Sequence, residues 1–189
     1  FQIYEFSDPW DQPLFEQALH YLMIKHPMMR TVHDFSGERP LQLVLKERAP
    51  PLRVVDMRNL DRDGIHAAVG QWAQSEQSIG LDTTVSLWRA AAHVLPGERF
   101  LYGMYLHHAL WDGWSLESFV TELYATYGLL KRGGDVAKYR PLPSYQQFVA
   151  LEHAAVSSDA HRAYWKQKLE GATLPLWTGR HQSASAFVQ

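Results

Sequence analysis

The sequence predicts an α/β fold in which a mixed, mostly antiparallel sheet is flanked by helices. Two observations carry this prediction. Segments with apolar residues at helical spacing alternate along the chain with short strand-like segments. In addition, two long apolar runs, residues 85–95 and 99–107, are separated only by Pro96-Gly97-Glu98, a pattern typical of adjacent antiparallel strands. We expect these two strands to form the centre of the sheet.

The first third of the chain predicts strands around one helix. Residues 1–6 have the composition of a strand. A helix is predicted from about Asp11 to His26 by the spacing of its apolar residues, and Pro27 helps to end it. Three more strands, the first two of them a hairpin, are predicted over residues 29–35, 41–45 and 52–55.

Helices dominate the predictions for the rest of the chain. One follows the second central strand, with Ser115 as its predicted cap and Glu117 in its first turn. Its apolar stripe, which we expect to pack on the sheet, consists of Leu116, Phe119, Val120, Leu123, Tyr127 and Leu130. Three other helices are predicted, over residues 63–78, 144–152 and 159–169. A connector over residues 132–143 precedes the second of these.

Composition narrows the class of protein. The 189 residues are 46% hydrophobic and 20% charged, and the formal net charge of -2 gives no electrostatic reason to expect nucleic acid or an anionic membrane as partner. Cysteine is absent, which excludes disulfides, thiolate zinc sites and cysteine nucleophiles. No apolar run approaches the roughly 20 residues that span a bilayer. These features favour a cytoplasmic location.

The segment that carries chemistry is His107-His108-Ala109-Leu110-Trp111-Asp112-Gly113, where a strand leads through a short loop into a helix. Because successive strand residues point to opposite faces, we expect His107 and His108 to have different roles. An imidazole, with an ordinary pKa of about 6.5, can take a proton from an attacking amine. Asp112 can orient a ring or pair with an arginine, and Gly113 permits a close approach that a side chain would block.

Three other interpretations of this segment remain open from the residues alone. The two histidines can be structural, with Asp112 a helix-start residue. A metal site is disfavoured, and no metal is predicted, because neighbouring strand residues diverge and no further ligand has the spacing of a metal site. A serine hydrolase is disfavoured because the chain has no Gly-x-Ser-x-Gly segment. Trp111 and Trp114 are interpreted as packing residues.

The same segment matches the His-His-x-x-x-Asp-Gly signature of condensation domains of nonribosomal peptide synthetases, a pattern shared more loosely by the chloramphenicol acetyltransferase-like superfamily. Three more segments resemble family motifs and follow in the family's order: His26-Pro27-Met28-Met29-Arg30-Thr31, Ser86-Leu87-Trp88-Arg89 and Tyr164-Trp165-Lys166-Gln167-Lys168-Leu169-Glu170-Gly171-Ala172. The chain therefore resembles the amino-terminal lobe of such a domain over residues 1–189, cut at both ends.

The resemblance implies a chloramphenicol acetyltransferase-like lobe that forms an amide bond between a donor acyl thioester and an acceptor aminoacyl thioester. It implies that His108 is catalytic, that His107 and Gly113 support it, and that Asp112 pairs with Arg30. Both substrates would arrive on the 4′-phosphopantetheine arms of donor and acceptor peptidyl carrier domains, and no cofactor would bind directly. The carboxy-terminal lobe of the same domain would complete the site.

Two alternatives to this activity are kept. One retains the fold and changes the reaction, as in a terminal cyclising or an epimerising condensation-like domain. The other is a non-catalytic scaffold or docking module in which the motif survives only as structure.

Overall fold

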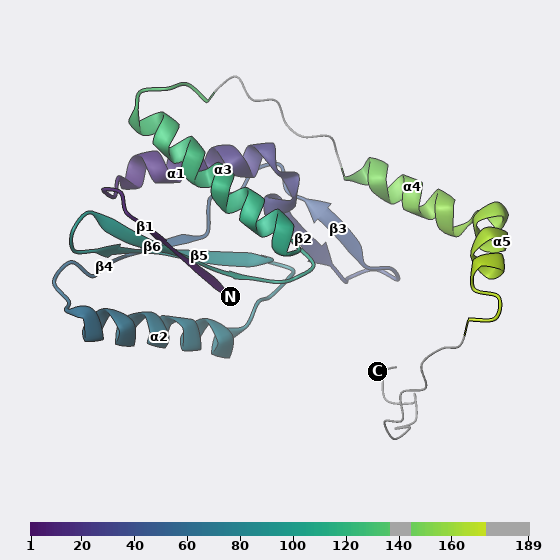
Figure 1. The fold of residues 1–189 in the computed structure, drawn as a ribbon, viewed down its shortest axis with the longest axis horizontal. Coiled ribbons are helices and arrows are strands. Elements are labelled where there is room, and N and C mark those ends of the chain that lie inside the picture. Colours follow the sequence, from purple (N-terminus) through teal and green to yellow (C-terminus); the bar gives the residue numbers. More distant parts are fainter. Residues whose placement is uncertain (137–144, 173–189) are drawn as a thin grey trace. The chain divides into compact units, whose positions relative to one another are not determined.

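The computed structural model describes residues 1–136 and 145–172, and the chain divides into two units, Phe1–Leu142 and Pro143–Gln189. The first unit contains a four-stranded sheet in the order β1-β6-β5-β4 (Figure 1). Its strands are β1 (Gln2–Phe6), β6 (Arg99–Leu106), β5 (Trp88–Leu95) and β4 (Leu52–Asp56). β6 is antiparallel to both β1 and β5, whereas β4 is parallel to β5. The predicted mixed, mostly antiparallel sheet with β5 and β6 at its centre is confirmed.

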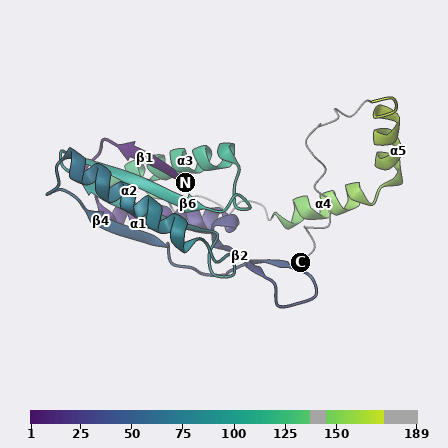
Figure 2. The same ribbon diagram turned by 90° about the horizontal axis from the view of Figure 1, so that it is seen from below.

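Helices cover both faces of this sheet. α1 (Gln12–Lys25) and α3 (Gly113–Lys131) lie together on one face, and α2 (Arg62–Ile79) lies on the other (Figures 1 and 2). The main core fills the layer between the sheet and the α1–α3 pair. Its fully buried large side chains include Phe15, Leu19, Leu22, Trp88, Phe100, Tyr102, Leu123 and Tyr127. The apolar stripe predicted for α3 is buried as expected, because its period matches the helix.

The segment after α1 differs from the prediction. Residues 29–35 were expected to be extended, but η1 (Pro27–Arg30) is a turn of 3₁₀ helix, and strand β2 (Thr31–Asp34) starts only after it. Proline at the first position of η1 favours this turn, because its ring fixes φ near the helical value. The hairpin itself is confirmed, with β2 paired antiparallel to β3 (Leu41–Val44) in a separate two-stranded sheet.

α2 approaches the sheet closely at one glycine. A Cβ atom on Gly103, in the middle of β6, would lie 2.3 Å from Cη2 of Trp72, a buried side chain of α2. Trp72 also packs edge-on against His93 of β5, with 4.9 Å between the ring centroids. The indole therefore occupies the space that any larger residue at position 103 would need.

We expect Gly103→Ala to lower the free energy of unfolding by about 1 to 3 kcal/mol, because the added methyl overpacks the layer between α2 and the sheet. Urea denaturation of the two proteins measures this difference. Gly70→Ala is the matched control, since position 70 lies within α2 and has open space around it. Alanine there should raise stability by up to about 1 kcal/mol. Equal stability of Gly103→Ala and the parent protein would contradict the tight contact.

The described part of the second unit, residues 145–172, contains two helices, α4 (Gln146–Val156) and α5 (Asp159–Lys168), close to the predicted ranges. The Ser158 hydroxyl caps α5 by accepting a hydrogen bond from the backbone nitrogen of His161 at 3.2 Å. Neither helix buries a residue among those described. Residues 137–143 of the predicted connector lie outside the described residues. No helix in the described ranges is long and apolar enough to cross a bilayer.

Candidate active site

The predicted reactive segment forms a tight turn between β6 and α3. The backbone nitrogen of His107 donates to the carbonyl of Leu87 at 2.8 Å, which extends the contact between the two central strands by one residue. The nitrogen of Leu110 then donates to the carbonyl of His107 at 2.9 Å and closes the turn. Leu110 is only 4% exposed and joins the main core. This buried leucine anchors a turn whose other early residues, His107, His108 and Ala109, are exposed.

The two histidines are not strand residues, so the prediction that they point to opposite faces of a strand is wrong. β6 ends at Leu106, and both histidines belong to the segment that follows. Their environments nevertheless differ. Nδ1 of His107 accepts a hydrogen bond from the nitrogen of Ala109 at 3.1 Å and so stabilises the turn. Among the described residues, none hydrogen-bonds to the exposed His108 ring, which leaves this imidazole open to a reacting group.

Asp112, and not Ser115, caps α3. Its carboxylate accepts a hydrogen bond from the backbone nitrogen of Ser115 at 2.8 Å. Hydrogen bonds from the side chain and backbone of Ser115, with a smaller contribution from the charge of His108, hold the pKa of the Asp112 carboxyl below its ordinary value. Aspartate and serine are both good caps, so a sequence with the two only three positions apart leaves the choice open.

The expected ion pair between Asp112 and Arg30 is wrong for the described structure, in which no ion pair involves either residue. Nε of Arg30 donates to the carbonyl of Met23 at 2.8 Å, and Nη1 donates to the carbonyls of Leu45 and Lys46. The guanidinium thus joins the end of α1 to the segment after β3. These carbonyls, at the ends of a helix and a strand, accept the hydrogen bonds of the Arg30 guanidinium. The Asp112 carboxylate instead accepts a hydrogen bond from the first turn of α3.

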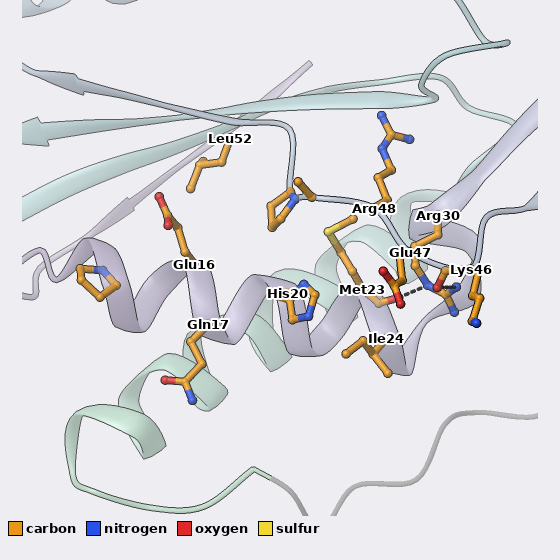
Figure 3. A pocket seen from close by; sticks show the side chains of 13 residues that line it. Glu16, Gln17, His20, Met23, Ile24, Arg30, Lys46, Glu47, Arg48 and Leu52 are labelled. Atoms are coloured by element: carbon orange, nitrogen blue, oxygen red, sulfur yellow. Dashed lines mark hydrogen bonds between the residues drawn. The ribbon is translucent and has the colours of Figure 1, made fainter.

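Arg30 lies at one end of a groove of about 1230 Å³ beside α1 (Figure 3). Glu16 and His20 line it from α1, and Leu52 lines it from the opposite side. None of the described residues of the His107–Gly113 segment lines this groove. The structure therefore places Arg30 in a groove that the other four predicted site residues do not line, whereas His107, His108, Asp112 and Gly113 lie in the short segment from the end of β6 to the start of α3.

Gly113 is the first residue of α3, and a Cβ atom there would meet nothing within 4 Å. Its φ does not lie in the left-handed region. Packing within the described residues therefore does not require glycine at this position, and the space in front of the backbone is open to another molecule. Within the same described ranges, no three histidine, aspartate or glutamate side chains are arranged to hold a metal ion.

The sequence interpretation missed a second cluster next to the turn. Trp114 is 85% exposed, which overturns its interpretation as a packing residue, whereas Trp111 packs on Phe119 as expected. The off-stripe position of Trp114, two residues before Leu116, was a usable signal. Nε2 of His26 lies 2.6 Å from Oε2 of Glu122. No sequence pattern could indicate this pair, because 96 residues separate its members.

The cap geometry gives a sharp prediction for Asp112. Asp112→Ala should destabilise the protein by about 0.5 to 2 kcal/mol, because the nitrogen of Ser115 loses its acceptor. Asp112→Asn should be close to neutral, because an amide oxygen can accept the same hydrogen bond. Thermal or urea unfolding of the two variants measures the difference. A loss of stability for Asp112→Asn as large as that for Asp112→Ala would show that the charge matters and would restore the ion-pair interpretation.

Comparison with known proteins places this geometry in a family. The condensation domain family matches residues 2–186. The AMB antimetabolite synthetase AmbE of Pseudomonas aeruginosa is 34% identical over 176 residues, which are 90% of this chain and 8% of that protein. The nonribosomal peptide synthetase kk1B of Curvularia clavata is 30% identical over 161 residues, which are 82% of this chain and 1% of that protein. The chain thus spans less than a tenth of the length of these two relatives.

Solved structures share the fold. The starter condensation domain of the rhizomide synthetase RzmA is similar with a TM-score of 0.78 at 18% identity, over 92% of this chain and 42% of that one. The first condensation domain of the calcium-dependent antibiotic synthetase, in complex with a substrate analogue, has a TM-score of 0.73 at 22% identity, over 91% and 42% of the two chains. The resemblance found in the sequence motifs is confirmed by these matches, and the chain belongs to the condensation domain family.

Proposed function

We propose that this chain carries the reacting-site turn of a condensation domain that forms amide bonds between carrier-bound substrates in nonribosomal peptide synthesis. One observation carries the proposal. His108 is exposed and not hydrogen-bonded to any described residue, and it lies in a turn that the buried Leu110 anchors just before Asp112 caps α3. A rigid turn that presents one open imidazole suits the positioning of a nucleophile.

The reaction that we propose exchanges a thioester for an amide. The acceptor amine attacks the carbonyl carbon of the donor thioester, the new C–N bond forms, and the C–S bond breaks to release the donor thiol. The amine loses a proton, which the thiolate finally takes up. We assign His108 to the amine, either as its base or as the group that positions it. The open space at Gly113 lets the carbonyl oxygen approach the first backbone N–H groups of α3, which favour developing negative charge.

The partners in this proposal are two peptidyl carrier domains and a further lobe of the same domain. The 4′-phosphopantetheine arms belong to the carriers and are parts of the substrates, so this chain need bind no cofactor of its own. The solved relatives are more than twice as long as this chain, which supports a second lobe. The uncovered helices of the second unit support it too, since their large exposed apolar side chains include Phe148, Leu151, Val156 and Trp165. A cytoplasmic location remains a prediction from composition.

The direct test supplies the full-length protein with donor and acceptor carriers that have been loaded chemically, and detects the product on the acceptor carrier by mass spectrometry. A donor acyl group transferred to the acceptor amine supports the proposal. Absence of transfer from a folded protein would contradict it.

Epimerisation is the second candidate, because the epimerization domain of tyrocidine synthetase B has the same fold, with a TM-score of 0.72 at 20% identity. In deuterated water, an epimerase would incorporate deuterium at the α-carbon of a single loaded substrate. Such exchange without amide formation would favour this second function.

A further inference from the structure

A hollow of about 340 Å³ opens beside the reacting-site turn, between the first turns of α3 and the end of α1. Its apolar walls are the rings of Trp111, Trp114 and Phe119. The ring centroids of Trp111 and Phe119 lie 4.5 Å apart, and both residues belong to or pack on the main core. One wall is therefore fixed by packing. Trp114, in contrast, is 85% exposed, so packing does not fix the position of its indole.

This exposed indole needs an explanation. Large aromatic side chains gain from burial, and a tryptophan left in water next to other apolar rings is typical of a surface that a ligand covers. A flat ring inserted between Trp114 and the Trp111–Phe119 pair would cover apolar area on both of its faces. The hollow is therefore suited to an aromatic group.

The hollow also has polar lining residues, of which the one carboxylate is already paired. Glu122 lines the hollow with His26, whose Nε2 is 2.6 Å from the carboxylate, and Lys25 forms an ion pair with the same carboxylate. Because Lys25 already offsets the charge of Glu122, this lining favours a neutral hydrogen-bonding group over an ion. Ser115 and Ser118 also line the hollow, and their hydroxyl groups can donate and accept hydrogen bonds.

The hollow is lined in part by residues that follow His108 closely in the chain. Trp111 belongs to that turn, Trp114 and Ser115 belong to the first turn of α3, and the carboxylate of Asp112 holds the nitrogen of Ser115. A side chain seated in the hollow would fix the rest of its acyl group close to the turn that carries His108. Binding energy gained at such a remote group can be used to position the reacting atoms.

We propose that this hollow, lined by Trp111, Trp114, Phe119, Ser118, His26 and Glu122, binds the side chain of one carrier-bound acyl group and selects an aromatic ring with a neutral hydrogen-bonding substituent, such as a phenol. The assignment to an acyl group rests on the proposed amide-forming function. The preference for a phenol-like ring rests on the hollow alone and can be tested without any reaction.

The binding test uses p-cresol and toluene, which differ by one hydroxyl group. In the ¹⁵N-labelled full-length protein, p-cresol should shift the indole N–H signals of Trp111 and Trp114 saturably, and toluene should bind about 10-fold or more weakly, since a polar site rejects a ligand that lacks the matching group. Ser118→Leu, which fills the hollow, should abolish the shifts. Signals of Trp111 and Trp114 that do not respond to p-cresol, or that respond equally to toluene, would overturn the proposal.

The activity test compares a tyrosyl with an alanyl group, loaded in turn on the donor and on the acceptor carrier. On one of the two carriers, Ser118→Leu should reduce the ratio of kcat/KM for the tyrosyl group to kcat/KM for the alanyl group about 10-fold or more. Ala125→Leu is the matched control, because position 125 lies two turns further along α3, is exposed and does not line the hollow.

A failure of the proposed amide-forming function can be distinguished from a failure of the proposed selection by the hollow. A parent protein that forms no amide with any substrate contradicts the proposed function, whereas p-cresol binding remains a separate test of the hollow. Amide formation in which Ser118→Leu and Ala125→Leu behave alike toward both side chains contradicts the selection by the hollow and leaves the function standing.

Discussion

Replacement of His108 by alanine is expected to slow amide formation by about 10²- to 10⁴-fold, the range typical of a side chain that handles a proton in the transition state. The variant should fold normally. The His108 ring is exposed and has no hydrogen bond to the described residues, so its removal leaves no buried group unpaired. The measurement uses chemically loaded carriers in single-turnover reactions, so that earlier steps cannot limit the rate.

His107→Ala is the informative control for this experiment. That substitution removes the acceptor of the Ala109 nitrogen and should loosen the turn, so its effect on rate should be accompanied by lower thermal stability. His108→Ala should change the rate without changing stability. Parent-like product formation by His108→Ala would remove His108 from catalysis and favour a scaffold role for the domain.

Acid is expected to destabilise the first unit by about 3 kcal/mol through one buried residue, His93. This side chain of β5 is fully buried, and neither ring nitrogen has a hydrogen-bond partner among the described residues. Burial in the layer beneath α2, reinforced by the positive charge of Arg53, lowers the pKa of His93 to about 4. The unfolded chain would protonate the same imidazole at its ordinary pKa of about 6.5.

These two pKa values determine whether the free energy of unfolding rises or falls with pH. Above pH 6.5 the imidazole is neutral in both states, and stability does not depend on it. Between pH 6.5 and 4 only the unfolded state takes up the proton, so the free energy of unfolding falls as the pH falls, and the loss levels off below pH 4 at about 3 kcal/mol. Urea denaturation at several pH values between 7.5 and 4.5 measures this trend.

His93→Leu isolates the contribution of the imidazole from that of carboxylates that titrate in the same range. At pH 7.5 the variant should be as stable as the parent or more so, because it removes a buried polar group that has no partner. The parent should then lose stability faster than the variant as the pH falls. Parallel curves for the two proteins would show that His93 is hydrated or paired in solution.

Hydrophobic periodicity was sufficient to predict the layered architecture. The stripe of α3 and the two apolar runs of β5 and β6 have clear periods, and each element lies within a few residues of its predicted range. Errors in the predicted elements arose where the same sequence signal was compatible with two local structures. Asp112 and Ser115 are both good caps, and the apolar run of β6 continues into His107 without a signal that the strand has ended.

The candidate site was predictable as a segment but not as a geometry. His107, His108, Asp112 and Gly113 had to lie in one short segment, because they are close in sequence. The donors of Arg30 were assigned to the wrong partner, since the carbonyls they reach depend on how α1 and β3 end. The His26–Glu122 pair and the hollow beside it depend on contacts between distant segments, which a single sequence does not reveal.

The position of β1 in the sheet has a consequence for synthesis on the ribosome. Gln2 pairs with Met104, so β1 must wait until roughly 100 further residues have been added before its partner β6 exists. At about 5 to 20 residues per second, that delay is on the order of 5 to 20 s. During this interval the strand Gln2–Phe6 has no hydrogen-bonding partner, and the apolar side chains of Phe1, Ile3 and Phe6 lie in it or next to it. Neighbouring nascent chains on the same messenger RNA can then pair with this strand. A chaperone that holds residues 1–6 during this interval should therefore raise the yield of folded protein.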